Sequence, residues 1–163
     1  MRVIHKLKIL NVDDLVIPEE AKEVIREFGI DELYPPQEEG VEDVLDGKNC
    51  VFALPTASGK SLLAYLAIIK KVLQQGGKAL YIVPLRALAS EKYDDLKKFE
   101  KLGLKVSISM GYYYSPDPSL RKNDIIIATS EKADSLLRQN VDWLNQINVM
   151  IADEIHLIND RER

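Results

Sequence analysis

The stretch ALPTASGKS, residues 53–61, decides the expected fold of this chain. It ends in Gly-Lys-Ser, as a phosphate-binding loop does, but the usual pattern G-x-x-x-x-G-K-S/T has a glycine where this chain has Leu54. In such a loop, backbone N–H groups between a strand and a helix converge on phosphate oxygens. Because these donors belong to the backbone, Leu54 at the end of a strand needs no glycine, whereas Gly59 lies where the backbone approaches the phosphate closely. The stretch is therefore predicted to hold a phosphate.

The side chains of this loop have separate predicted roles. Lys60 supplies a mobile cation for the terminal phosphates, and the Ser61 hydroxyl can ligate Mg²⁺. The alternative is a chance Gly-Lys-Ser at the start of a helix, and the position between an expected strand and an expected helix favours the loop. The predicted nucleotide-binding residues here are Leu54, Pro55, Thr56, Ala57, Ser58, Gly59, Lys60 and Ser61.

The remaining sequence alternates between helical and strand patterns. Helices are expected over residues 17–28, 35–48, 60–74, 85–103 and 130–139, and strands over residues 49–54, 78–83, 105–110, 124–129 and 148–153. Short apolar strands bounded by helices, without clean alternation, are typical of a parallel sheet that is buried on both faces. We therefore expect an α/β domain, mainly a parallel sheet with helices on both faces.

The composition restricts the class of protein. The chain has 163 residues, 46% of them hydrophobic and 29% charged, which is the balance of one soluble globular domain. Its net charge of −4 argues against a protein that coats nucleic acid with a wholly basic surface. This charge does not exclude a local basic groove. The single cysteine, Cys50, is expected in the core. The longest apolar run, residues 61–69, is far below the roughly 20 residues of a membrane span, and no signal-peptide pattern opens the chain. A cytoplasmic location is expected.

A second candidate site lies in NVMIADEIH, residues 148–156, where an apolar strand ends in two acids. In open α/β sheets, ligands gather at the carboxyl ends of the strands. Asp153 is predicted to bind Mg²⁺ with Ser61, and Glu154 is predicted to orient water toward the γ-phosphate. The predicted catalytic residues are thus Lys60, Asp153 and Glu154; the alternative for the acid pair is a solvated strand end.

DEIH also resembles the DExH box of superfamily 2 helicases, and the order of the other motifs agrees. LYPPQ resembles the Q motif, PTASGKS motif I, VPLRALASEK motif Ia and ATSEKADSLL motif Ib. Together these motifs are similar to those of the archaeal DExH-box DNA-repair helicases, which are similar to the helicase half of DNA polymerase theta. The resemblance covers residues from about 15 to 163.

The resemblance implies a function and a domain organisation. It implies a RecA-like phosphate-loop NTPase fold, ATP and Mg²⁺ as cofactors, translocation 3′ to 5′ on single-stranded DNA, and unwinding of forked DNA in repair. An N-terminal extension with a helix is expected at residues 1–30, and the first RecA-like domain at residues 31–163, ending just past the DExH motif. The second RecA-like domain with its arginine finger and the accessory DNA-binding domains are expected elsewhere, so residues 1–163 alone are not expected to unwind DNA. A monomer without membrane contact is expected.

The resemblance also assigns roles to individual residues. Gln37 would read the adenine edge through its amide, which can donate and accept at once. His156 would couple the nucleotide site to motifs elsewhere in the enzyme. Arg86 would contact a DNA phosphate, and Thr129 and Ser130 would donate hydroxyl or backbone hydrogen bonds to the strand. The alternative for Gln37 is a solvated helix residue, and the alternative for His156 is a satisfied core residue. For the three DNA-contact residues, the alternative is a surface structural role.

One patch departs from the family's pattern, and two other functions stay open. Tyr112, Tyr113 and Tyr114 stand where the family more often has an acid, and a half-buried cluster at a strand exit is favoured over base stacking. Another phosphate-loop enzyme, such as a small-molecule kinase or a GTPase, is disfavoured because no Asn-Lys-x-Asp guanine signature is present and Gln37 favours adenine. A module that binds nucleotide without turnover is the third reading. Only the family resemblance favours DNA over RNA.

Overall fold

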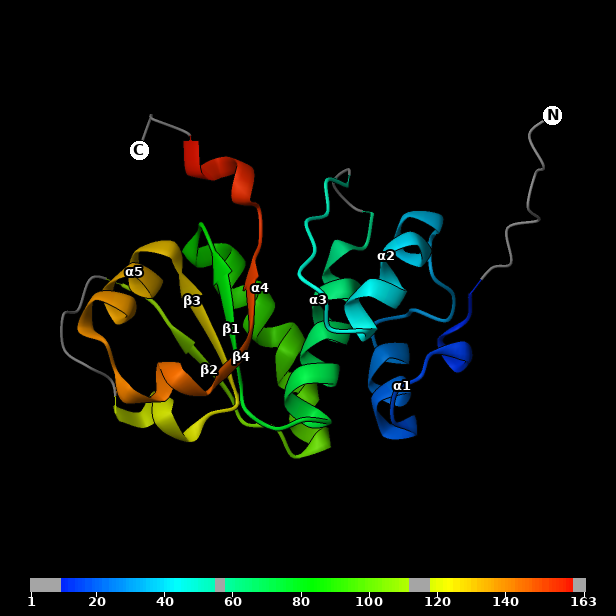
Figure 1. Ribbon diagram of the computed structural model, residues 1–163, viewed down its shortest axis with the longest axis horizontal. Coiled ribbons are helices and arrows are strands. Elements are labelled where there is room, and N and C mark those ends of the chain that lie inside the picture. The colour runs from blue at the N-terminus through cyan, green and yellow to red at the C-terminus, as the bar shows by residue number, and fades with distance from the viewer. Residues whose placement is uncertain (1–9, 55–57, 112–117, 160–163) are drawn as a thin grey trace. The chain divides into compact units, whose positions relative to one another are not determined.

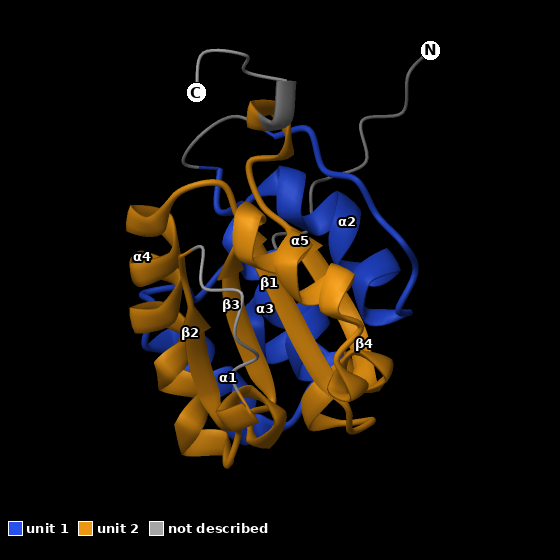
Figure 2. Ribbon diagram, turned by 90° about the vertical axis from the view of Figure 1, so that its left-hand side faces the viewer, with its two compact units in different colours: residues 1–70 blue, residues 71–163 orange. Residues whose placement is uncertain are grey.

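The computed structural model describes residues 10–54, 58–111 and 118–159. The chain divides into two compact units, residues 1–70 and residues 71–163, which Figure 2 shows in different colours. Each unit is described by itself. The domain boundary expected at residue 30 stays a prediction.

The first unit is helical within the part that the structure describes. It contains a short 3₁₀ helix η1 (Val12–Asp14), then α1 (Glu19–Arg26), α2 (Pro35–Leu45) and α3 (Lys60–Ile68). The π-helical turn η2 (Ile69–Leu73) continues α3 past residue 70, where the first unit ends. Prolines open α1 and α2, as their fixed φ allows at a helix start. The tilted rings of half-buried Phe28 and buried Tyr65 lie together in this unit, with centroids 5.1 Å apart. The three expected helices are therefore confirmed.

The strand expected over residues 49–54 is wrong. Residues 48–54 have no regular secondary structure, and the sheet of the second unit consists of four other strands. A strand needs a hydrogen-bonded neighbour, which a short apolar run cannot supply alone. Val51 is 92% exposed, and the segment is anchored by the Phe52 ring, which lies so close to Gly40 of α2 that a Cβ there would overlap it. Cys50 is half-buried, so its expected place in the core is also wrong.

The second unit contains a four-stranded parallel sheet in the order β2-β3-β1-β4. The strands are β1 (Lys78–Val83), β2 (Val106–Ser109), β3 (Ile125–Thr129) and β4 (Ile147–Ala152). Every residue of β3 is buried, as expected for a central strand covered on both faces. At the carboxyl edge Val83 lies opposite Thr129, and Ile82 opposite Ala152. The four corresponding strand predictions are confirmed, and so is the parallel sheet.

Helices cover this sheet on opposite sides (Figure 1). Ala133 and Leu136 of α5 (Ser130–Gln139) pack with Leu80 and Ile126 of the sheet and with Trp143. On the other side, α4 (Arg86–Leu96) contacts β1, β2 and β3. Short helical turns complete this unit: η3 (Lys97–Leu102), η4 (Pro118–Lys122), η5 (Asp142–Gln146) and η6 (Ile155–Asn159). The expected helix over residues 85–103 is thus an α-helix followed by a 3₁₀ turn.

Two remaining expectations concern the tyrosine cluster after β2 and membrane-spanning helices. Tyr112, Tyr113 and Tyr114 lie outside the described residues. Among the described residues, the helices are all too short or too polar to cross a membrane.

Candidate functional site

The described part of the loop at residues 53–61 is built around the start of α3. Gly59 is the N-cap of this helix and adopts the left-handed backbone conformation, with φ of 74°, which glycine tolerates far better than other residues. Lys60 and Ser61 follow in the first helical turn, where backbone N–H groups and the helix dipole favour an anion. Pro55, Thr56 and Ala57 lie outside the described residues, and Leu54 is half-buried in the irregular segment before them.

A polar atom without a partner lies beside Gly59. The Ser58 hydroxyl oxygen is buried and has no hydrogen-bond partner among the described residues. A buried hydroxyl without a partner costs about 1–3 kcal/mol, so a ligand that supplies one would be favoured there. Phosphate oxygens can accept from this hydroxyl and from the helix N-terminus. The residues present therefore fit a phosphate group.

Gln37 is the third residue of α2 and is 1% exposed. Its Oε1 accepts a hydrogen bond from the backbone N of Tyr34 at 2.7 Å, which closes the start of α2. Its Nε2 donates to the backbone oxygen of Gly59 at 2.8 Å. The amide thus joins α2 to the phosphate loop, an arrangement that the adenine-reading hypothesis did not foresee.

In the second unit, the two acids lie at the carboxyl edge of the parallel sheet. The backbone N of Asp153 donates to Ile82 O at 2.9 Å, which extends the β1–β4 pairing to the acid. Asp153 Oδ1 accepts from the backbone N of Glu154 at 2.9 Å, and Oδ2 accepts from the Tyr81 hydroxyl at 3.0 Å. The Asp153 carboxylate is therefore held at both oxygens.

Glu154 has a backbone conformation that is rare for its residue type. Its φ is 51°, in the left-handed region, which for a non-glycine residue costs about 1–2 kcal/mol. Its side-chain Oε2 lies 3.3 Å from His156 Nδ1, and His156 is mostly exposed. Residues in unfavourable backbone regions cluster at functional sites. The Glu154 backbone thus leaves the extended path of β4 directly after Asp153.

Of the three residues expected to contact DNA, Thr129 is the last residue of β3, Ser130 follows it, and Arg86 follows the end of β1. Because the strands are parallel, the segments after β1 and β3 lie at the same edge as Asp153. Arg86 is exposed at the start of α4. Ser130 Oγ donates to Val83 O at 3.3 Å, and the buried Thr129 Oγ1 accepts from Lys132 N at 3.4 Å as the N-cap of α5. The structure thus brings Arg86 and the acids to one edge but uses the Thr129 hydroxyl inside the fold.

The sequence-derived site omitted Tyr81, whose hydroxyl contacts Asp153. The apolar strand KALYIV shows only that Tyr81 is buried. The neighbour of β1 is set by the strand order, and only that order places the phenol beside the end of β4.

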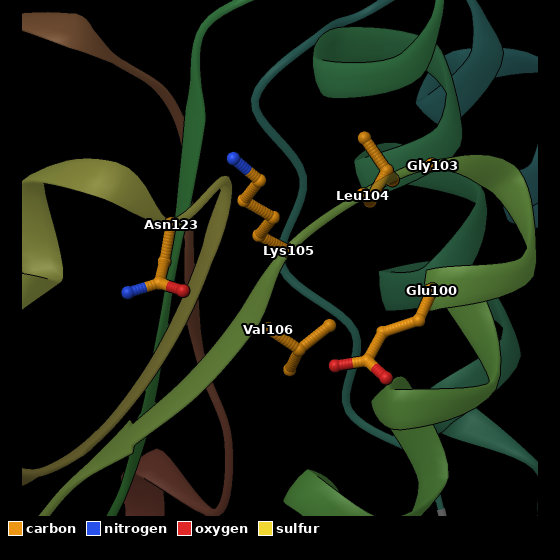
Figure 3. Close-up of a pocket in the computed structure, with 6 residues that line it drawn as sticks. All are labelled: Glu100, Gly103, Leu104, Lys105, Val106 and Asn123. Atoms are coloured by element: carbon orange, nitrogen blue, oxygen red, sulfur yellow. The ribbon is translucent and has the colours of Figure 1, made fainter.

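A cavity of about 320 Å³ lies elsewhere in the second unit, and Figure 3 shows its lining. Lys105 and Asn123 come from the segments before β2 and β3, and Glu100 from η3. These residues lie at the amino ends of the strands, so the cavity is separate from the edge that carries Asp153. The described residues contain no group of three or more His, Cys, Asp and Glu side chains suited to a metal ion.

The phosphate-adapted start of α3 and the acid pair after β4 have complementary chemistry. Proteins that carry both on an α/β fold form the class of phosphate-loop nucleoside triphosphatases. Comparison with known proteins identifies the family within this class. The model of the DEAD/DEAH box helicase family matches residues 34–163, and the chain belongs to this family.

Two curated relatives are archaeal. The chain is 53% identical over 155 residues to the ATP-dependent DNA helicase Hel308 of Pyrococcus abyssi, covering 94% of this chain and 22% of the relative. It is 51% identical to Hel308 of Thermococcus kodakarensis, of which it covers 14%. The chain therefore spans about a fifth or less of the length of these relatives. The resemblance to archaeal DNA helicases drawn from the motifs is confirmed.

Two solved structures have a similar fold. The DUF1998 helicase MrfA bound to DNA and AMPPNP gives a TM-score of 0.70 at 29% identity, covering 86% of this chain and 21% of that chain. A hypothetical ATP-dependent RNA helicase from Sulfolobus tokodaii gives 0.72 at 26% identity, covering 88% and 43%. These neighbours confirm the expected α/β fold of the helicase type.

Proposed function

We propose that this chain is the ATP-binding motor domain of a DNA helicase, which couples ATP hydrolysis to 3′–5′ translocation on single-stranded DNA and to unwinding of forked DNA in repair. The observation that carries the proposal is the turn at Asp153 and Glu154, where a carboxylate held at both oxygens precedes a Glu in the left-handed conformation. Family membership and relatives named as ATP-dependent DNA helicases support it.

The proposal divides the nucleotide chemistry among named residues. Lys60 binds the terminal phosphates, with Ser58 and the backbone after Gly59 as further donors. Ser61 and Asp153 would hold Mg²⁺, which needs only one or two protein oxygens beside the phosphates. When bound, this ion supplies neutralisation of phosphate charge. That the bound ion is Mg²⁺ is part of the proposal.

Hydrolysis needs a group that orients the attacking water and accepts its proton. Glu154 is assigned this role because the neighbouring Asp153 carboxylate already accepts hydrogen bonds from Tyr81 and from the Glu154 backbone. His156 Nδ1 lies 3.3 Å from Glu154 Oε2. Through this contact, a conformational change elsewhere in the enzyme would alter the position of the Glu154 carboxylate. This contact supports the coupling role expected of His156.

The nucleic-acid strand is assigned to the carboxyl edge of the sheet. Arg86 is exposed there and can contact a phosphate, while Ser130 offers a hydroxyl. Thr129 stays in the proposal only through its backbone, because its side chain is buried and caps α5. A few phosphate contacts on a chain of net charge −4 make binding weak and sensitive to salt.

RNA is the second candidate substrate, since one structural neighbour is named an RNA helicase. DNA is favoured because the relatives at 51–53% identity are named DNA helicases. Partner domains, namely a second RecA-like domain and accessory DNA-binding domains, remain part of the proposal, as do the monomeric state and a cytoplasmic location.

The test is the ATP hydrolysis rate of the intact protein with single-stranded DNA or single-stranded RNA of the same sequence. Stimulation by DNA, with unwinding of a fork that has a 3′ single-stranded tail, supports the proposal. An Arg86→Ala variant should need more DNA for the same stimulation, and Ser90→Ala on the exposed face of α4 is the matched control. Stimulation by RNA alone would establish the second candidate, and no hydrolysis with either strand would refute both.

A further inference from the structure

We propose that Tyr81 is a positioning residue for Asp153: its phenol holds the carboxylate in the orientation in which it binds the divalent cation that accompanies ATP. The inference rests on the proposed function, because that function places the cation at Asp153. No motif of the helicase family assigned in the sequence includes Tyr81, and the contact follows from the tertiary structure alone.

The strand order places the two residues together. β1 lies between β3 and β4, and Tyr81 is opposite Ile127 on one side and Ile151 on the other. Asp153 is two residues after Ile151, so both side chains lie on the face of the sheet that Tyr81 occupies. The diagonal distance between such positions suits a long side chain that points toward the strand end. Tyr81 is therefore well placed to reach Asp153, just beyond the end of β4.

The phenol is held firmly. Tyr81 is 1% exposed, so its ring has little freedom to leave the core, and its hydroxyl lies 3.0 Å from Asp153 Oδ2. Buried tyrosine hydroxyls normally find a partner, and a backbone carbonyl would serve for packing alone. Here a partner is the acid at the end of the neighbouring strand. A charge-assisted hydrogen bond of this kind is roughly twice as strong as one between neutral groups.

Three contacts then define the direction of the Asp153 carboxylate. Its backbone is fixed by Ile82 O, Oδ1 by the Glu154 backbone N, and Oδ2 by Tyr81. A carboxylate offers about four lone-pair directions, so each oxygen keeps one beyond these bonds. The remaining directions are those available to a cation. Partners that orient a metal ligand in this way typically change metal affinity or activity by 10- to 100-fold when removed.

The test replaces Tyr81 by Phe in the intact protein. Tyr81→Phe keeps the buried ring and removes only the hydroxyl, so the packing of β1 is retained. Binding of a non-hydrolysable ATP analogue is measured by calorimetry across a series of Mg²⁺ concentrations. We expect the Mg²⁺ concentration for half-maximal enhancement to rise about 10-fold, while the affinity for the analogue without Mg²⁺ stays the same. Tyr93→Phe, which removes a hydroxyl from a half-buried side chain of α4, should leave both values unchanged.

A double-mutant cycle with Asp153→Asn separates this inference from the proposed function. If Tyr81 acts through Asp153, Tyr81→Phe has no further effect on Mg²⁺ dependence once Asp153 is Asn. An unchanged Mg²⁺ midpoint in Tyr81→Phe, together with a shifted midpoint in Asp153→Asn, overturns the inference and leaves the metal assignment standing. An unchanged midpoint in Asp153→Asn overturns the metal assignment itself and the inference with it.

Discussion

The Gln37 side chain donates a hydrogen bond from Nε2 to the backbone oxygen of Gly59, with 2.8 Å between the two atoms. A Cβ at Gly59 would overlap the same Nε2 atom. The amide and the glycine are thus in close contact, and the loop conformation depends on both. Gln37 was expected to read adenine, and in this structure its side chain supports the phosphate loop.

Gln37→Ala should weaken binding of ATP and of inorganic tripolyphosphate alike. Loss of a buried hydrogen bond to the loop costs about 1–3 kcal/mol, which corresponds to roughly 5- to 150-fold in affinity. Calorimetric titration with both ligands measures this, with Glu39→Ala on the exposed face of α2 as the control. Weaker ATP binding with unchanged tripolyphosphate binding would instead favour adenine reading.

Lys60→Ala should weaken nucleotide binding and abolish hydrolysis in the intact protein. The charge-assisted contact to the terminal phosphates is worth about 1.5–3 kcal/mol. Equilibrium binding of a fluorescent ATP analogue and a phosphate-release assay measure the two effects. Lys70→Ala, beyond the end of α3, is the control. Hydrolysis at the normal rate in Lys60→Ala would refute the phosphate-loop assignment.

Glu154→Gln and Asp153→Asn should have different effects. Glu154→Gln keeps near-normal binding of Mg·ATP and lowers hydrolysis by about 10²-fold or more, since general-base help is of that size. Asp153→Asn instead weakens the Mg²⁺ dependence of binding. Single-turnover hydrolysis and binding titrations distinguish them, and equal effects of both variants on binding alone would contradict this division of roles.

Thr129→Val should lower stability by about 0.5–1 kcal/mol, at the low end for loss of an N-cap, because the bond to Lys132 N is long at 3.4 Å. Denaturant unfolding of the intact protein measures the change. The affinity for single-stranded DNA should stay the same, because the buried hydroxyl is not accessible to a ligand. A large loss of DNA affinity at unchanged stability would instead support the contact between the Thr129 side chain and DNA that was expected from the sequence.

Much of the fold could be predicted because local signals coincided with the final structure. The strand at residues 78–83 has the predicted bounds, since a continuous apolar run follows two glycines and precedes Pro84. The helix at residues 130–139 also matches, with Thr129 as its N-cap. The segment at residues 49–54 carried an equally apolar pattern but no paired edge, so the same reasoning was wrong there.

The candidate site also has features that the sequence determined and contacts that only the tertiary structure decided. The sequence by itself determined the chemical groups and their order: Gly59, Lys60 and Ser61 at a helix start, and Asp153 and Glu154 at a strand end. Such motifs are readable because backbone geometry over a few residues fixes what they can bind. The contacts of Gln37 with Gly59 and of Tyr81 with Asp153 join residues 22 and 72 positions apart. Only the tertiary structure decided them, because which strand lies beside which, and which buried polar group finds which partner, depend on packing across the whole unit.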